Sequence, residues 1–274
     1  MTWRLITIRP SHYCEKARWA LDYFSLPYVE RPQLPMLHFP AVVAALLPRQ
    51  AGRADPQSTR FSTPALITGA RALTDSSEIL AFANVQANDR ERDLFWTPEA
   101  AELERHFSGR FGADVRVAVY HTLLPHTDLL IELARRSVGP VQAGVFIASL
   151  PAIRVGLRER LGVREDRAQR AWSRITAMFD EVDARLDDGR PFLCGDRFSA
   201  ADLSFAALAS LALGVGHSDG YGAWIPELDA LGGELEARAR QLRARPSGAF
   251  VLRMFAEHRG RRALPCRVGQ HETR

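Results

Sequence analysis

The architecture of the chain follows from residues 3–24, which read WRLITIRPSHYCEKARWALDYF. Residues 3–8 are short, apolar and rich in β-branched side chains, as is typical of a buried strand. Pro10 and Ser11 interrupt this run, and from Cys14 the apolar residues recur at helical spacing up to residue 24. A strand that leads directly into a helix predicts the start of an α/β domain.

The alternation of strands and helices continues to about residue 83. Residues 28–31 are typical of a second strand, and a strand–helix–strand unit implies that its two strands are parallel. Residues 64–68 and 71–73 flank a Gly69-Ala70 turn and predict a hairpin. Residues 74–76 then offer cap residues for a helix. Within residues 32–62, only an apolar piece at 41–47 is helical in pattern.

A polar, unperiodic stretch at residues 86–98 predicts a linker, and the pattern beyond it is helical. We expect helices at about 99–135, 141–161, 164–187, 199–214, 234–244 and 247–258. The apolar stripe of 164–187 consists of Ala168, Ala171, Trp172, Ile175, Phe179, Val182 and Leu186. The predicted domains are therefore an α/β domain at 1–85, the linker at 86–98, an all-helical domain at 99–259 and a basic tail at 260–274.

Composition excludes several classes of protein. The chain has 274 residues, and its 36 basic and 32 acidic side chains give a net charge of +4, too weak to argue for nucleic-acid binding. Lys16 is the only lysine, and we expect most of the arginines on solvated helix faces. No apolar run approaches the ~18 residues of a membrane span, so no membrane partner is expected.

The three cysteines are widely spaced and odd in number. This pattern excludes a disulfide framework and an ordinary structural zinc site, so no metal is expected. It also fits a reducing compartment, and the first residues lack the layout of a signal peptide. We therefore predict a cytoplasmic protein.

Three segments carry residues suited to chemistry. Ser11 and Cys14 lie where a helix begins, and a helix N-terminus stabilises a nearby anion such as a thiolate. Thr63-Pro64 stands at the start of a strand, where a cis proline leaves the preceding backbone open to an extended peptide. Asp75-Ser76 begins a helix and suits an ammonium and a carboxylate. Each segment also has a plain structural interpretation: Ser11 and Asp75 as helix caps, Cys14 as a buried apolar residue and Pro64 as a trans proline.

The order and spacing of these segments resemble those of cytosolic glutathione transferases, of bacterial type with a serine- or cysteine-type active-site turn. The matching motifs are Ser11-x-x-Cys14 followed by Lys16-x-Arg18-Trp19-Ala20-Leu21, Thr63-Pro64-Ala65-Leu66, Thr74-Asp75-Ser76-x-x-Ile79-Leu80, and Phe192-Leu193-Cys194-Gly195-Asp196-Arg197-Phe198-Ser199-Ala200-Ala201-Asp202-Leu203. The resemblance implies a thioredoxin-like N-terminal domain followed by an all-α C-terminal domain.

The resemblance also implies roles for single residues. Ser11 aligns with the catalytic serine or cysteine, Thr63 pairs through its backbone with the cysteinyl part of glutathione beside a cis Pro64, and Asp75 and Ser76 bind the γ-glutamyl end. Ser199 and Asp202 form a capping box with a structural role. His38, Gln50 and Arg53 are candidates for the glycine end. Phe111, Tyr120 and His121 are candidates for contacts with the second substrate.

The chain departs from the family pattern at the active-site turn. Thr7 stands where the tyrosine-type classes carry their tyrosine, and His12 stands where proline is common. Ser11 precedes Cys14, so either Ser11 donates to a glutathione thiolate or Cys14 forms a mixed disulfide. Cys14 falls inside the first helical turn, which favours Ser11.

These observations predict a detoxifying transferase that conjugates or reduces a small hydrophobic electrophile with glutathione as co-substrate. The first alternative is a glutathione-dependent thiol reductase that uses Cys14. The second is a non-catalytic interaction protein with the same fold, and nucleic-acid binding through the arginines is a third. The resemblance further implies a homodimer.

Overall fold

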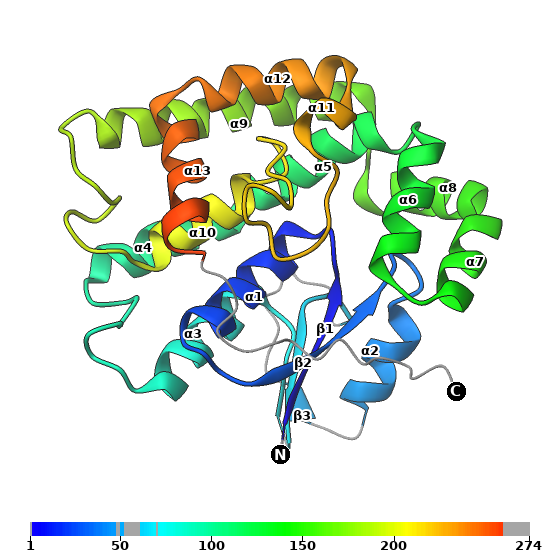
Figure 1. Cartoon of the computed structure of the whole chain (residues 1–274), viewed down its shortest axis with the longest axis horizontal. Helices are drawn as coiled ribbons and strands as arrows, with labels where there is room; N and C mark the ends of the chain where they lie inside the picture. Colours follow the sequence, from blue (N-terminus) through cyan, green and yellow to red (C-terminus); the bar gives the residue numbers. More distant parts are fainter. Residues whose placement is uncertain (1, 48–49, 52–60, 70, 260–274) are drawn as a thin grey trace.

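A computed structural model describes residues 2–47, 50–51, 61–69 and 71–259 (Figure 1). The first part of the chain is a five-stranded mixed sheet with the strand order β2-β1-β4-β5-β3 and three helices. Its elements are β1 (Trp3–Ile8), α1 (His12–Tyr23), β2 (Tyr28–Gln33), α2 (Phe39–Leu46), β3 (Gln50–Ala51), β4 (Ala65–Thr68), β5 (Arg71–Leu73) and α3 (Ser76–Ala87).

The strand pairings confirm the two predicted units. β1 and β2 are parallel, with Trp3 opposite Tyr28, because α1 carries the chain back between them. β4 and β5 form the antiparallel hairpin, and β4 also pairs antiparallel with β1. The short β3 beside β5 was not predicted. In the sequence, its two residues lie in a polar stretch without alternation.

The two faces of the sheet are covered by different helices. Leu5 and Leu66 pack with α1 and α3, whereas Ile6 and Ile67 pack with α2. Because successive strand residues point to opposite faces, the unbroken apolar runs in β1 and β4 are explained by burial on both sides. This arrangement leaves the start of α1 at the end of β1 that faces the helical part (Figure 1).

The remaining described chain is helical. Its elements are α4 (Pro98–His106), the π-helical turn η1 (Phe107–Phe111), α5 (Gly112–Leu123), α6 (Thr127–Ser137), α7 (Pro140–Ala148), α8 (Leu150–Leu161), α9 (Glu165–Leu186), α10 (Ala200–Ala209), α11 (Leu228–Leu231), α12 (Gly233–Arg243) and α13 (Pro246–Glu257). The predicted tail at 260–274 lies outside the described residues.

The helix expected at about 99–135 is not continuous. η1 interrupts it in its first third, and it breaks again between α5 and α6, where Pro125 cannot supply a helical N–H. The stripe predicted for residues 164–187 is confirmed, because six of its seven residues are buried in α9 and Leu186 packs at the edge of the core. The helix expected at 199–214 ends at Ala209, and its residues are all buried.

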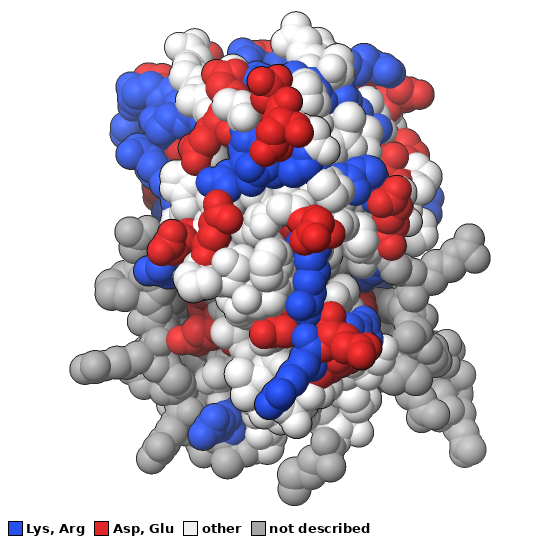
Figure 2. All heavy atoms as spheres, turned by 90° about the vertical axis from the view of Figure 1, so that its left-hand side faces the viewer, with Lys and Arg blue, Asp and Glu red and all other residues white. Residues whose placement is uncertain are grey.

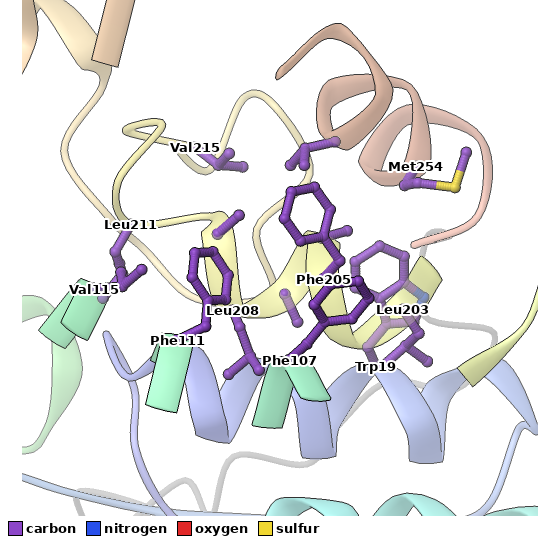
Figure 3. Close-up of a cluster of buried hydrophobic side chains, with 14 of the residues drawn as sticks. Trp19, Phe107, Phe111, Val115, Leu203, Phe205, Leu208, Leu211, Val215 and Met254 are labelled. Carbon is purple, nitrogen blue, oxygen red and sulfur yellow. The ribbon is translucent and has the colours of Figure 1, made fainter. Parts of the chain in front are cut away.

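The main core joins the two halves of the molecule. Trp19 of α1, Phe107 and Phe111 of η1 and Phe205 of α10 point toward one another (Figure 3). The rings of Phe111 and Phe205 stack with their centroids 5.7 Å apart. Since α1 lies between the sheet and α10, the element that carries Ser11 is held from both sides.

A second apolar cluster lies in α6–α8, which stand to the right of the sheet in Figure 1. Phe146, Leu150 and Ile153 of these helices pack against Leu34, which directly follows β2. Among the described residues, no single helix is long and apolar enough to cross a membrane; α7 and α8 meet that criterion only when taken together, and they are bent by 76° at their junction.

Charged side chains of both signs are interspersed on the face shown in Figure 2. Many exposed arginines pair with an acid one helical turn away, as Arg170 does with Asp166 and Arg238 with Glu234. Such exposed pairs contribute little to stability. Arg18 and Arg259 depart from the expected solvated positions, because both are fully buried.

Candidate active site

Ser11 begins α1 in an extended conformation, with φ −76° and ψ 126°. Its N–H donates to the Ile8 carbonyl at 2.9 Å, and its carbonyl accepts from the Glu15 N–H at 2.9 Å. Within α1, all of which the structure describes, the Ser11 hydroxyl makes no capping bond. The hydroxyl therefore lies beside the unpaired N–H groups of the first turn without accepting a hydrogen bond from them.

Cys14 points into the protein and is fully buried. Its sulfur accepts the Ile8 N–H at 3.4 Å, and the side chains of Ser11 and Thr63 hydrogen bond to it. Burial raises the pKa of the Cys14 thiol, and the Arg18 charge and these donors only partly oppose that effect. The thiol is thus protonated at neutral pH and shielded from solvent, unlike a reactive cysteine.

The Thr63-Pro64 peptide bond is cis, as the family resemblance implied, and the alternative of a trans proline is wrong. β4 begins at Ala65, so Thr63 lies just outside the strand ladder. The contact of the Thr63 side chain with Cys14 places this segment beside the start of α1. Ser11, Cys14 and Thr63 are therefore brought together from two separate motifs.

Asp75 caps α3 in the manner that its plain structural interpretation predicts. Its Oδ1 accepts the N–H of Ser77 at 2.7 Å and that of Glu78 at 3.2 Å. Ser76 is the first residue of α3 and is buried. The pKa of Tyr13 is raised mainly by burial and also by the charge of Asp75. The start of α3 therefore lies near the first turn of α1, which carries Tyr13.

Lys16 anchors α1 to three other elements: α3, α4 and η1. Its buried Nζ donates to Ser77 Oγ at 2.9 Å, to Ser108 Oγ at 2.7 Å and to the carboxylate of Glu104. Burial favours the neutral form of Glu104, but Lys16 outweighs it and lowers the pKa of this carboxyl. Sequence reasoning placed Lys16 in a motif without assigning it this role.

A second buried ionic cluster joins α1 to the end of the helical part. Glu15 accepts two bonds from Arg18, at 2.9 and 2.7 Å, and one from Arg259 Nε at 2.5 Å. Arg18 also donates to Glu30 at 2.9 Å. Burial alone would raise the pKa of Glu15, but the two guanidinium groups lower it to about 2. This cluster fixes the orientation of α1. Sequence reasoning missed it because Glu15 and Arg259 are 244 residues apart.

An apolar pocket opens beside Ser11. Ile8 and Pro10 line it from the turn before α1, Leu34 and Pro35 from the end of β2, and Tyr120 from α5. Its volume is about 930 Å³, including the space open to solvent. Eight further wall residues come from α6–α8: Leu129, Leu130, Leu133, Ala134, Phe146, Leu150, Ile153 and Leu157. Another part of the wall is formed by residues between 211 and 235.

Of the three candidates for contact with a second substrate, Tyr120 lies at this pocket. Phe111 lies in the main core against Phe205 and outside the pocket wall. His121 does not line the pocket, and its Nε2 lies 3.0 Å from a carboxylate oxygen of Glu165. Apolar periodicity alone could not distinguish core from pocket positions on this helix.

Two of the three candidates for the glycine end lie in the described region. His38 is the N-cap residue of α2 and is buried, which lowers its pKa to about 4. Gln50 contributes its backbone to β3. Arg53 lies outside the described residues.

Ser199 and Asp202 form the predicted capping box of α10. Asp202 accepts the N–H and the hydroxyl of Ser199, at 2.8 and 2.6 Å, and the N–H of Leu193 at 2.7 Å. This site lies in the helical part, far along the chain from the pocket residues of α6–α8. Within the described residues, no group of three or more His, Cys, Asp or Glu side chains is arranged to hold a metal ion.

Comparison with protein families identifies the chain. A model of the glutathione S-transferase N-terminal domain matches residues 10–86, and a model of the C-terminal domain of the same family matches residues 165–244. The chain belongs to the glutathione S-transferase family. The first match covers Ser11, Thr63 and Asp75, and the second covers the capping box.

Solved structures have the same fold as this glutathione S-transferase at low sequence identity. A glutathione S-transferase of Ceriporiopsis subvermispora in complex with glutathione is 15% identical, with a TM-score of 0.59 over 96% of this chain and 100% of that one. The glutathione transferase GSTFuA3 from Phanerochaete chrysosporium is 14% identical, with a TM-score of 0.56 over 93% and 96%. The β-etherase LigF from Sphingobium sp. strain SYK-6 is 15% identical, with a TM-score of 0.54 over 92% and 99%. A search of curated protein sequences finds no significant match.

Proposed function

We propose that this glutathione S-transferase is an enzyme that uses the thiolate of glutathione to conjugate or reduce a small hydrophobic electrophile. One observation carries the proposal: the Ser11 hydroxyl stands at the N-terminus of α1, is not used to cap that helix, and adjoins an apolar pocket through Pro10. The solved Ceriporiopsis subvermispora relative, which contains glutathione, supports the choice of co-substrate.

The chemistry needs a thiolate at neutral pH. A free thiol has a pKa of about 8.5, and lowering it by about 2 units takes about 2.7 kcal/mol of differential stabilisation. A hydrogen bond from Ser11 and the positive end of the α1 dipole both favour the anion. Cys14 is fully buried and its thiol stays protonated, so in this proposal it does not attack the substrate.

The other motif residues hold the tripeptide in this proposal. The backbone of Thr63, next to the cis Pro64, pairs with the cysteinyl part, while the first turn of α3 binds the γ-glutamyl end through Asp75 and Ser76. The electrophile occupies the apolar pocket and contacts Tyr120. Holding both partners in contact supplies much of the rate gain in such a reaction.

The test combines binding and kinetics. We expect the protein to be retained on immobilised glutathione and eluted by free glutathione. Loss of one charge-assisted hydrogen bond costs about 1.5–3 kcal/mol, so Ser11→Ala should lower kcat/KM roughly tenfold to a hundredfold. Cys14→Ala, the matched control one turn away, should keep most of the activity.

Two results would overturn the proposal in different ways. A protein that flows through the glutathione column supports the non-catalytic interaction protein, in which Asp75 is only a helix cap. Activity that is lost in Cys14→Ala but kept in Ser11→Ala supports a thiol reductase.

Family membership also supports a homodimer, and a sedimentation mass of 30.6 kDa, the monomer value, would exclude it. The free thiols of Cys14 and Cys194 fit a cytoplasmic location, which fractionation of the source cells tests. A detoxifying role follows if several unrelated electrophiles are accepted.

A further inference from the structure

Arg116 of α5 is a cation without a counterion in the described part of the chain. Its side chain is only partly exposed, and its Nε is buried without a hydrogen-bond partner. Three other partly buried arginines of the helical domain pair with an acid: Arg174 with Asp114, Arg243 with Asp219 and Arg245 with Asp183. Arg154 and Arg197 have no acidic partner, but their guanidinium groups donate to oxygen atoms of neighbouring residues. Within the described residues, Arg116 has neither an acidic partner nor a hydrogen-bond acceptor.

The groups around Arg116 are neutral or already engaged. Its guanidinium lies over the Tyr13 ring, 5.6 Å from the centroid. His12 donates or accepts through Nε2 at the Gly112 carbonyl, 3.0 Å away, and burial together with Arg116 lowers its pKa to about 3. Asp114, the acid nearest in sequence, is held by two bonds from Arg174, at 2.7 and 2.5 Å. None of these groups compensates the charge of Arg116.

Arg116 lies where the two halves of the proposed active site meet. On one side, Tyr13 follows Ser11 by two residues in the first turn of α1. On the other side, Tyr120 is one turn further along α5 and lines the apolar pocket. Arg116 interacts electrostatically with the hydroxyls of both tyrosines. An unpaired guanidinium in such a place fits a carboxylate, which it can bind through two parallel hydrogen bonds.

We propose that Arg116 binds a carboxylate of one of the two substrates, and this inference rests on the proposed glutathione-dependent function. Glutathione carries two carboxylates, and an electrophile with an apolar body and an acidic group would place its body in the pocket and its charge on Arg116. Both sources offer the same chemistry, so the experiment has one arm for each.

The variants are Arg116→Gln, which removes the charge, and Arg116→Lys, which keeps it. Arg110→Gln is the matched control, because Arg110 belongs to the adjoining η1 and its side chain is 75% exposed. The first arm measures by calorimetry the affinity for glutathione and for its diethyl ester. The second measures kcat/KM for chloronitrobenzoate and its methyl ester, in which the glutathione sulfur forms a bond to the aryl carbon, chloride leaves with the bonding electrons, and the thiol proton passes to solvent.

In one of the two arms, we expect Arg116→Gln to lower the measured affinity or kcat/KM for the free acid at least tenfold, and the value for its ester less than twofold. Arg116→Lys should keep part of the preference, and Arg110→Gln should match the wild type. The affected arm identifies which substrate supplies the carboxylate. If neither arm changes by more than twofold, the inference is wrong.

If the wild type binds no glutathione, the proposed function fails independently. Calorimetric titration with chloronitrobenzoate and its ester alone then decides whether Arg116 binds a carboxylate. Equal affinity of the wild type and Arg116→Gln for the acid would overturn the inference in that case.

Discussion

Replacing Arg259 with methionine would remove the charge that ties the end of the helical domain to α1. The Arg259 side chain is 2% exposed; its Nε donates to Glu15 at 2.5 Å, and its Nη1 lies 3.0 Å from Asp22. Methionine fills a similar volume against Trp19 without a charge, so the substitution tests the ion pair more than the packing.

The magnitude follows from the buried carboxylate. The ion pairs lower the pKa of Glu15 from 4.5 to about 2 against the effect of burial. At about 1.4 kcal/mol for each pH unit, this corresponds to about 3 kcal/mol. Breaking a buried pair by removing one partner typically costs about 3–5 kcal/mol. We therefore expect Arg259→Met to lower the free energy of unfolding by about 3 kcal/mol at neutral pH.

The assay is urea unfolding followed by tryptophan fluorescence and far-UV circular dichroism. Arg253→Gln is the control, because Arg253 lies on α13 near Arg259 but is partly exposed and its ion pair with Glu257 is 3.5 Å long. Its expected effect is below about 1 kcal/mol. The double variant Glu15→Gln with Arg259→Met should lose less than the sum of the single changes, since the two side chains interact directly.

The pH dependence gives a second check on the same reasoning. Because the pKa of Glu15 is lowered on folding, its contribution is present above pH 4.5 and is lost as the pH falls toward 2. Arg259→Met should reduce this loss. An unfolding free energy within about 1 kcal/mol of the wild type at pH 7 would refute the argument, because the cluster would then contribute no more than a surface pair.

Two further predictions concern buried titratable groups. Burial and Arg116, partly opposed by the Gly112 contact, leave His12 with a pKa of about 3. Below pH 6.5 the unfolded chain therefore binds a proton that the folded protein does not bind, so the free energy of unfolding should fall by about 1.4 kcal/mol for each unit that the pH decreases from 6.5 to 4. Urea titrations of His12→Gln should lack this part of the pH dependence. Asp202→Ala should lower the free energy of unfolding by about 2–4 kcal/mol, since three buried donors lose their acceptor. Its glutathione affinity should stay within twofold of the wild type by calorimetry, and a large drop would show that the capping box also shapes the binding site.

Much of the first domain could be predicted because its signals are local. The apolar run of residues 3–8, the break at Pro10 and the turn at Gly69 each act within a few residues, and the structure has the corresponding strands and helix. The cis bond at Pro64 was predicted from its motif and is confirmed. β3 was not predicted, since a two-residue strand leaves no period to detect.

In the helical domain and at the candidate site, the positions of single side chains could not be predicted from local sequence patterns. An apolar residue of η1 or α5 has the same helical spacing whether it lies in the core, as Phe111 does, or at the pocket, as Tyr120 does. Which of the two positions it takes depends on how the other helices pack around it, and the spacing along the chain does not reveal that packing. The burial of Glu15 and Arg18 depends likewise on Arg259, and no helical periodicity predicts charged residues inside the protein.

The burial of Lys16 makes the chain unusual toward reagents that attack amines. It is the only lysine, and its side chain is enclosed by Ser77, Glu104 and Ser108. On the folded protein, acylating labels therefore meet no accessible lysine side chain. A lysine-specific protease has a single site in the chain, after Lys16, which is accessible only when α1 separates from α3 and α4. Cleavage at that one bond thus reports how often α1 unfolds or detaches from its neighbours.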